Sequence, residues 1–162
     1  MIRHARPADR PAIGEVTAAA FGRTDEADLV ERLRKAGDVM FELVAEEDGQ
    51  IVGHILFSRL WADRIELLYA ALAPVSVRPD RQRQGLGGEL IRAGLDACRD
   101  FGASGVLLLG HPDYYPRFGF SAEAAAQVAS PYAGSPAFMA LALEDGAFEG
   151  PLTVAYPDAF TA

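Results

Sequence analysis

The sequence has little cysteine, little positive charge and no long apolar run. Cys98 is the only cysteine among 162 residues, which excludes an internal disulfide and a cysteine-based zinc site. Fifteen basic against 23 acidic residues give a net charge of −8. That balance argues against nucleic acid or an anionic membrane as the main partner, because both attract a basic surface. No cluster of histidine and acidic residues has metal-ligand spacing, so we expect no metal.

Sorting signals are also missing from the sequence. The N-terminal stretch MIRHARPADRP is polar and lacks the apolar core of a secretory signal. Apolar runs such as 106–109 are far too short to cross a bilayer. The composition, 50% hydrophobic and 23% charged, is that of a globular protein. We therefore predict one domain over residues 1–162, located in the cytoplasm and without a membrane partner.

The spacing of apolar residues predicts a mixed α/β fold. An Asp48-Gly49 pair supplies the turn of a hairpin. Pro74 interrupts a strand pattern and predicts a bulge or a strand edge, because proline cannot donate to a ladder. Helices are expected at 9–21, 25–36 and 85–101, and a helical turn near 112–118. Strands are expected at 40–46, 51–60, 65–77, 105–110, 137–143 and 152–155, with room for another at 2–4.

The ends and faces of these helices are also predicted by the sequence. Asp9 and Asp25 stand where N-terminal caps are expected, and Gly37 and Gly102 stand where helices end. Cys98 is expected to be a buried thiol rather than a nucleophile. The expected apolar stripe of the helix at 85–101 consists of Leu86, Leu90, Ala93, Ala97 and Phe101.

The most informative segment is a basic turn between a strand and a helix. Arg78, Arg81 and Arg83 stand within seven positions, directly before the glycine-rich run at 85–88. Glycine lets the backbone approach a ligand closely, and a helix N-terminus presents unpaired N–H groups with a positive dipole end. Guanidinium groups bind phosphate well. The segment therefore predicts a site for a phosphate-bearing ligand, although an exposed charged loop is the alternative.

Two common phosphate motifs do not fit this turn. The Walker A pattern needs Gly-Lys followed by Ser or Thr, which the sequence does not contain. The dinucleotide fingerprint needs a glycine at the position that Leu90 occupies.

Two ordered motifs resemble those of the GNAT superfamily of N-acetyltransferases. The first is Gln/Arg-x-x-Gly-x-Gly/Ala, matched by Gln82, Gly85 and Gly87 after a strand that ends at Val77 and Pro79. The second is Tyr-x-Lys/Arg-x-Gly-Phe, matched by Tyr115, Arg117, Gly119 and Phe120. The family often has Asn where this chain has Gly110-His111-Pro112, and that departure resembles a small bacterial subgroup of predicted acetyltransferases.

The resemblance implies a fold, a reaction and a set of site residues. The implied fold is a central, mostly antiparallel sheet with a splayed pair of strands, flanked by helices. The implied reaction is direct attack of a primary amine on the thioester of acetyl-CoA, with Tyr115 as general acid and backbone N–H groups near Val77 polarising the carbonyl. The implied cofactor-binding residues are Val75, Ser76, Val77, Gln82, Arg83, Gln84, Gly85, Leu86, Gly87 and Gly88.

The general base and the acceptor stay open at this stage. Glu66, His111 or a water molecule could take the proton of the amine. The acceptor is expected to be a small-molecule or peptide amine, and a homodimer is left open. An acyl-CoA sensor or interaction module without turnover is the alternative function, and another nucleotide-binding protein is a third. Residues that could line an acceptor cleft between the first helices and the sheet are Phe21, Glu26, Leu29 and Trp61.

Overall fold

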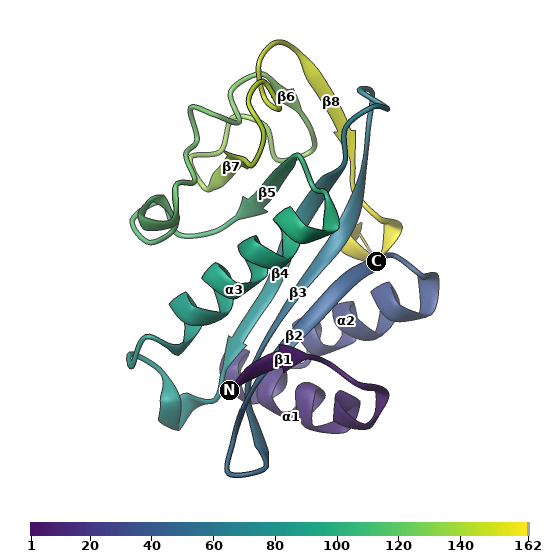
Figure 1. The fold of residues 1–162 in the computed structure, drawn as a ribbon. Helices are drawn as coiled ribbons and strands as arrows, with labels where there is room; N and C mark the ends of the chain where they lie inside the picture. Colours follow the sequence, from purple (N-terminus) through teal and green to yellow (C-terminus); the bar gives the residue numbers. More distant parts are fainter. Residues whose placement is uncertain (162) are drawn as a thin grey trace.

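The protein is built around one sheet with helices on both faces (Figure 1). A computed structural model describes residues 1–161. Across the sheet lie β1 (Ile2–His4), β2 (Val39–Glu47), β3 (Gln50–Ala62), β4 (Tyr69–Val77), β5 (Gly105–Leu109) and β7 (Phe138–Ala142). Along this path every neighbouring pair is antiparallel except β4 and β5. The end of β3 also pairs with β8 (Leu152–Ala155), which in turn pairs with β6 (Val128–Ala129).

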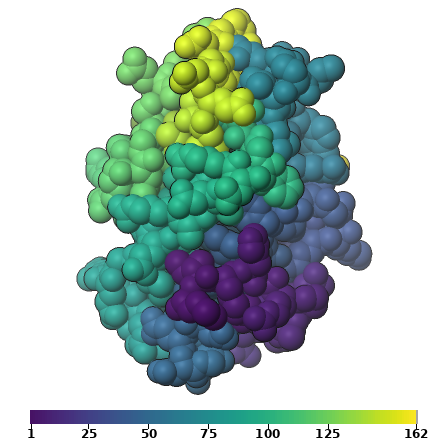
Figure 2. All heavy atoms as spheres, viewed as in Figure 1, coloured from purple at the N-terminus to yellow at the C-terminus, as the bar shows by residue number. Residues whose placement is uncertain are grey.

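The helices divide the core between the two faces of the sheet. Helix α3 (Leu86–Phe101) crosses one face, and α1 (Arg10–Phe21) and α2 (Asp25–Ala36) cover the other (Figure 1). The α3 face is filled by buried side chains of β2, β3 and α3, among them Phe41, Phe57 and Leu90. Figure 2 shows the N-terminal segment in purple and α3 in green packed against each other on the near side of the molecule. No described helix is long and apolar enough to cross a membrane.

The predicted mixed sheet with flanking helices is confirmed, although some of its elements differ from the prediction. The hairpin turn is confirmed, because Asp48 and Gly49 both have the positive φ, 51° and 76°, that such a turn requires. The strand expected at 65–77 begins only at Tyr69, since β3 continues to Ala62 and a turn follows. The short strand β6 was not predicted. The 3₁₀ turn at Tyr115–Phe118 confirms the helical turn expected near 112–118, and further 3₁₀ turns lie at Pro7–Asp9, Pro79–Arg81 and Asp158–Thr161.

Helix α3 buries a face slightly different from the predicted stripe. The buried residues include Leu90, Ile91, Gly94, Leu95 and Cys98, and Leu86, Ala93 and Ala97 of the predicted stripe pack against the same core. The expectation of a buried Cys98 is confirmed, and burial raises the pKa of its thiol to about 12. The predicted stripe is therefore wrong at Phe101, which is 54% exposed at the end of the helix, and the buried face is wider than predicted.

The prediction that Asp9 and Asp25 cap the N-termini of helices is wrong, whereas the predicted helix ends at Gly37 and Gly102 are confirmed. Asp9 precedes α1, but its carboxylate accepts hydrogen bonds from the Arg6 backbone N–H and the Arg3 guanidinium. Thr24, not Asp25, precedes α2. The helices are instead held by packing of their apolar faces on the sheet.

Two irregularities in β4 open the sheet. Ile55 pairs with Val75 and Phe57 with Leu72, so β4 carries one more residue than β3 at this point. This bulge contains Pro74, as its sequence position predicted. The paired register between β4 and β5 ends at Ala71, so the rest of β4 runs on with an open edge. The predicted splayed pair of strands is therefore β4 and β5.

Candidate active site

A pocket lies where β4 and β5 part, and we call it the splay pocket. Its cavity has a volume of about 480 Å³. One wall consists of the β4 bulge, residues 71–75, and the end of β5 with the following loop, residues 107–111. The other wall comes from α1, α2 and the C-terminal part of the chain. The side chains of that wall are Phe21, Glu26, Leu29, Tyr132, Tyr156 and Phe160, and Tyr115 completes the pocket.

A second hollow, the loop cleft, lies at the N-terminus of α3 and has a volume of about 460 Å³. Its lining residues are Val77, Gln82, Arg83, Gly85, Gly87, Gly88, Arg92, Tyr114, Arg117 and Phe118. The Glu89 N–H donates to the Gly85 carbonyl, so the amides of residues 86–88 come before the first helical hydrogen bond. These amides and the helix dipole make the cleft suitable for an anion.

The two cavities both border the open edge of β4. The Arg78 N–H donates to the Val52 carbonyl on β3. Because the backbone groups of successive strand residues point to alternate sides, the N–H and C=O groups of residues 76 and 78 point toward β3. Val75 and Val77 then direct their backbone groups to the open edge, and the Gln82 side-chain amide donates to the Val77 carbonyl at 2.9 Å. Val77 lines the loop cleft and Val75 lines the splay pocket. An extended ligand can therefore run from one cavity to the other along this strand.

Two neighbouring tyrosines serve different cavities. Tyr114 lines the loop cleft, and Tyr115 lines the splay pocket. Their rings stand nearly perpendicular, with centroids 5.2 Å apart. The Tyr115 ring lies so close to Gly110 that a side chain on Gly110 would collide with it. Burial, and to a lesser extent the neighbouring Tyr114, raises the pKa of Tyr115 to about 12, so its hydroxyl stays protonated near neutrality.

The basic cluster predicted from the sequence is only partly at the cleft. Arg78 donates to the Asp80 carboxylate at 2.6 Å, and Arg81 donates to Glu47 at 2.9 Å. Arg83 does line the loop cleft. The other cleft arginines come from elements outside the cluster. The guanidinium of Arg92 lies over the Phe118 ring at 5.0 Å, and that of Arg117 lies over the Tyr114 ring at 4.5 Å.

The remaining predicted cofactor residues lie around the two cavities rather than in them. Ser76 is buried opposite His54, on the face of the sheet that α1 and α2 cover. Gln84 is exposed, and its side-chain amide donates to the Asp80 carbonyl. Leu86 packs against the core under α3.

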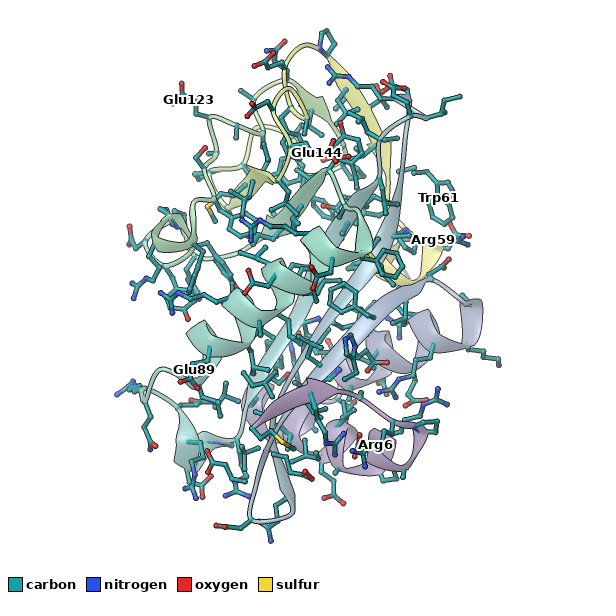
Figure 3. The ribbon with its side chains drawn as sticks, viewed as in Figure 1. Arg6, Arg59, Trp61, Glu89, Glu123 and Glu144 are labelled. Atoms are coloured by element: carbon teal, nitrogen blue, oxygen red, sulfur yellow. The ribbon has the colours of Figure 1, made fainter. Side chains whose placement is uncertain are left out.

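The predicted acceptor residues are brought together except for one. Phe21, Glu26 and Leu29 line the splay pocket. Trp61 does not, because it stands 46% exposed at the end of β3 with the Arg59 guanidinium 4.7 Å from its ring (Figure 3). The sequence missed Tyr132, Tyr156 and Phe160, which reach the pocket through long-range packing.

The two candidate bases are placed very differently by the structure. His111 lies at the rim of the splay pocket, where its carbonyl accepts hydrogen bonds from the backbone N–H groups of Tyr114 and Tyr115. Glu66 was expected on a strand, but it lies in the exposed turn between β3 and β4 and does not line the pocket. Of the two side chains, only His111 is placed to act on a ligand there.

A buried polar network joins α2 to β2 and β3. The Arg34 guanidinium donates to both oxygens of the Glu42 carboxylate, at 2.7 and 3.0 Å, and His54 Nε2 lies 2.8 Å from one of them. Burial lowers the pKa of His54, so its ring is neutral and donates from Nε2. Burial alone would raise the pKa of Glu42, but the hydrogen bonds from His54 and Arg34 bring it down to about 2.

Comparison with known proteins assigns the chain to a family. The sequence model described as the acetyltransferase (GNAT) family matches residues 10–120. The Escherichia coli K12 protein described as uncharacterized N-acetyltransferase YhbS is 35% identical over 152 residues, which cover 93% of this chain and 91% of that protein.

Two solved structures agree with this match over nearly the whole chain. The E. coli YhbS structure in complex with CoA matches with a TM-score of 0.92 and 33% identity. The match covers 100% of this chain and 92% of the YhbS chain. A Brucella melitensis GNAT acetyltransferase in complex with acetyl-CoA matches with a TM-score of 0.82 and 42% identity, over 99% of this chain and 97% of the Brucella chain. The resemblance found in the two sequence motifs is thus confirmed, and the chain belongs to the GNAT family of acetyltransferases.

Proposed function

We propose that the protein transfers the acetyl group of acetyl-CoA to a primary amine, with the acyl carrier along the open edge of β4 and the amine in the splay pocket. The observation that carries this proposal is that both cavities lie along the open edge of β4, with Val77 in the loop cleft and Val75 in the splay pocket. A long ligand with a phosphorylated head and a slender arm matches that shape. The E. coli and Brucella relatives are solved with CoA and acetyl-CoA respectively.

The residues of the loop cleft fit the phosphate groups of such a ligand. Gly87 and Gly88 carry unpaired helix-terminal amides, and Arg83, Arg92 and Arg117 supply positive charge around them. A methyl group on Gly87 would project toward the Tyr114 hydroxyl, into the cleft where the head of the ligand would lie. Tyr114 and Phe118 offer aromatic faces beside these arginines.

The residues of the splay pocket supply the groups that acyl transfer needs. Acetyl-CoA supplies an activated acetyl thioester, whose C–S bond breaks as the C–N bond of the amide forms. The outward N–H of Val75 polarises the carbonyl oxygen, two residues from the position that the sequence predicted. His111, or a water molecule at the pocket, takes the proton that the nitrogen loses. Tyr115 fills the predicted role of general acid, because its protonated hydroxyl donates a hydrogen bond to the departing sulfur, which leaves as a thiolate and takes its proton from solvent.

Ligand binding and thiol release test the two halves of this proposal separately. Calorimetry with CoA, ATP and NAD side by side should show CoA preferred by at least about tenfold, or about 1.4 kcal/mol. Release of free thiol from acetyl-CoA in the presence of primary amines then tests transfer. Binding without release for any amine would favour the alternative, an acyl-CoA sensor without turnover. Equal affinity for the three ligands would overturn the cofactor assignment.

The cytoplasmic location, the single domain and self-association remain predictions of the sequence. The acceptor is proposed only as a small-molecule or peptide amine at this point, and the shape and charge of the splay pocket narrow that class below.

A further inference from the structure

The acceptor wall of the splay pocket is apolar and well packed. Tyr156 contacts Tyr132 edge to face, with centroids 5.1 Å apart at 89°, and contacts Phe160 in the same way at 5.3 Å and 75°. Phe21 and Leu29 extend this wall from the helix side. Rings locked in this way leave a surface that suits a flat or branched hydrocarbon body.

The charge on this wall is negative and comes from one residue. Among the described residues that line the pocket, Glu26 is the one Asp or Glu side chain, and no Lys or Arg is present. Its carboxylate is held by Arg23 through two hydrogen bonds of 2.6 and 3.0 Å. These bonds lower the pKa of Glu26, so the carboxylate is charged at neutral pH. Arg23 does not line the pocket and 60% of its side chain is exposed, so it is the carboxylate of this pair that borders the pocket.

An anionic group on a ligand would therefore meet no Lys or Arg among the described residues that line this pocket. Its hydration would be lost against apolar walls, and the carboxylate of Glu26 would repel it. A positively charged ammonium group finds the opposite situation, because Glu26 attracts it and aromatic faces accept a cation. The buried hydroxyl of Tyr156 has no hydrogen-bond partner in the described part of the chain and remains available to a neutral polar atom.

We propose that the acceptor is a primary amine on an aromatic or branched aliphatic body that carries no carboxylate or phosphate, and that Glu26 selects it. This inference rests on the proposed function and narrows its substrate class. Glu26 acts on entry, by favouring the ammonium form in the pocket and by excluding anions. The amine then gives up its proton before attack, as the transfer requires.

A matched set of amines tests the exclusion of anions. 2-Phenylethylamine, phenylalanine and phenylalanine amide share one aromatic body and differ in whether a carboxylate stands beside the amine. We expect kcat/KM for 2-phenylethylamine and for the amide to exceed that for phenylalanine by at least about tenfold. Ethanolamine, which lacks the apolar body, should also be at least about tenfold poorer. Phenylalanine or ethanolamine used as well as 2-phenylethylamine would overturn the proposal.

The role of Glu26 is tested with a variant on the same helix as control. Glu26→Gln keeps the shape of the side chain and removes its charge, and Asp28→Asn removes a charge from an exposed position of α2 that does not line the pocket. We expect Glu26→Gln to raise KM for 2-phenylethylamine about tenfold, with little change in kcat, and to narrow the preference over phenylalanine. Asp28→Asn should match the wild type. Equal behaviour of the two variants would overturn the role of Glu26.

A binding measurement keeps this inference separate from the transfer reaction. Calorimetry of the same amines against the CoA-loaded protein reports pocket selectivity without chemistry. Binding of 2-phenylethylamine in preference to phenylalanine, with no thiol release, would support the pocket assignment while overturning acetyl transfer. Binding of none of these amines, or preference for phenylalanine, would overturn the pocket assignment itself.

Discussion

Replacing Tyr115 by phenylalanine removes one hydroxyl from the splay pocket and is the sharpest test of the proposed chemistry. The ring would remain packed against Phe120 and Gly110, so we expect the fold to be preserved. What is lost is the hydroxyl that we propose as the donor to the departing sulfur. The measured quantities are kcat and KM for thiol release from acetyl-CoA with a saturating amine.

The magnitude of the loss follows from the pKa of Tyr115. At about 12, this pKa lies well above that of an ordinary thiol, about 8.5, so complete proton transfer to sulfur is uphill by about 5 kcal/mol. The hydroxyl therefore contributes mainly as a hydrogen-bond donor to developing negative charge. Loss of one such donor costs about 10²- to 10³-fold in kcat, or about 3–4 kcal/mol. We expect that fall in kcat, with KM for acetyl-CoA little changed.

Two results would refute this reasoning. A Tyr115→Phe protein that keeps kcat within about threefold of the wild type would show that the hydroxyl has no role in the chemistry. An alkaline decline in kcat near pH 10 that disappears in the variant would show that burial does not raise the pKa of this phenol. Tyr114→Phe is the control, because that hydroxyl belongs to the loop cleft and its removal should spare kcat.

Three further substitutions probe the cofactor site and the framework. Gly87→Ala adds a methyl whose nearest neighbours lie at 3.6 and 3.7 Å; we expect an unchanged melting temperature and at least about tenfold weaker CoA binding by calorimetry. Glu42→Gln should lower the free energy of unfolding at neutral pH by about 3 kcal/mol, because it leaves Arg34 buried with a weaker partner. Gly94→Ala places a methyl 2.5 Å from the Phe57 ring and should lower the melting temperature by several degrees.

The Glu42 prediction also has a direction in pH. The folded pKa of about 2 lies below the ordinary value of 4.5, so the carboxylate adds its full stability above pH 4.5 and loses it as the pH falls toward 2. In denaturant titrations, the free energies of unfolding of the wild type and of Glu42→Gln should therefore converge as the pH falls over that range. A difference in the free energy of unfolding that stays constant with pH would contradict the proposed role of Glu42 in the network. For Gly87→Ala, unchanged CoA affinity would contradict the prediction. For Gly94→Ala, an unchanged melting temperature would contradict close packing at this position.

Local signals in the sequence were enough to predict most of the framework. Helix and strand periods reflect which face is buried, and Pro74 marked the bulge because a proline lacks the N–H that a ladder needs. The tyrosine of the second motif, Tyr115, could be located, but not its separation from the neighbouring Tyr114 into a different cavity. That separation depends on the turn of the chain after β5, which places adjacent side chains on opposite sides.

Features that depend on distant parts of the chain could not be predicted. Tyr156 reaches the splay pocket because β8 pairs with the far end of β3, a contact between segments about ninety residues apart. Trp61 was expected in the pocket, but strand alternation puts it with Arg59 on the exposed side of β3. Composition alone gives no information on either pairing.

The distribution of charge shows why an acidic protein can still bind a phosphate-bearing cofactor. Arg78 and Arg81 are balanced by Asp80 and Glu47, so the arginines that make the sequence look basic contribute little to the cleft. The cleft depends instead on Arg83 and on arginines from two other segments, together with helix-terminal amides. At the other end of the open β4 edge, Glu26 is the one Asp or Glu among the described residues that line the pocket, and its partner Arg23 lies outside the lining. The proposed arrangement places an anionic acyl carrier beside arginines and a cationic amine beside this carboxylate, at opposite ends of the strand.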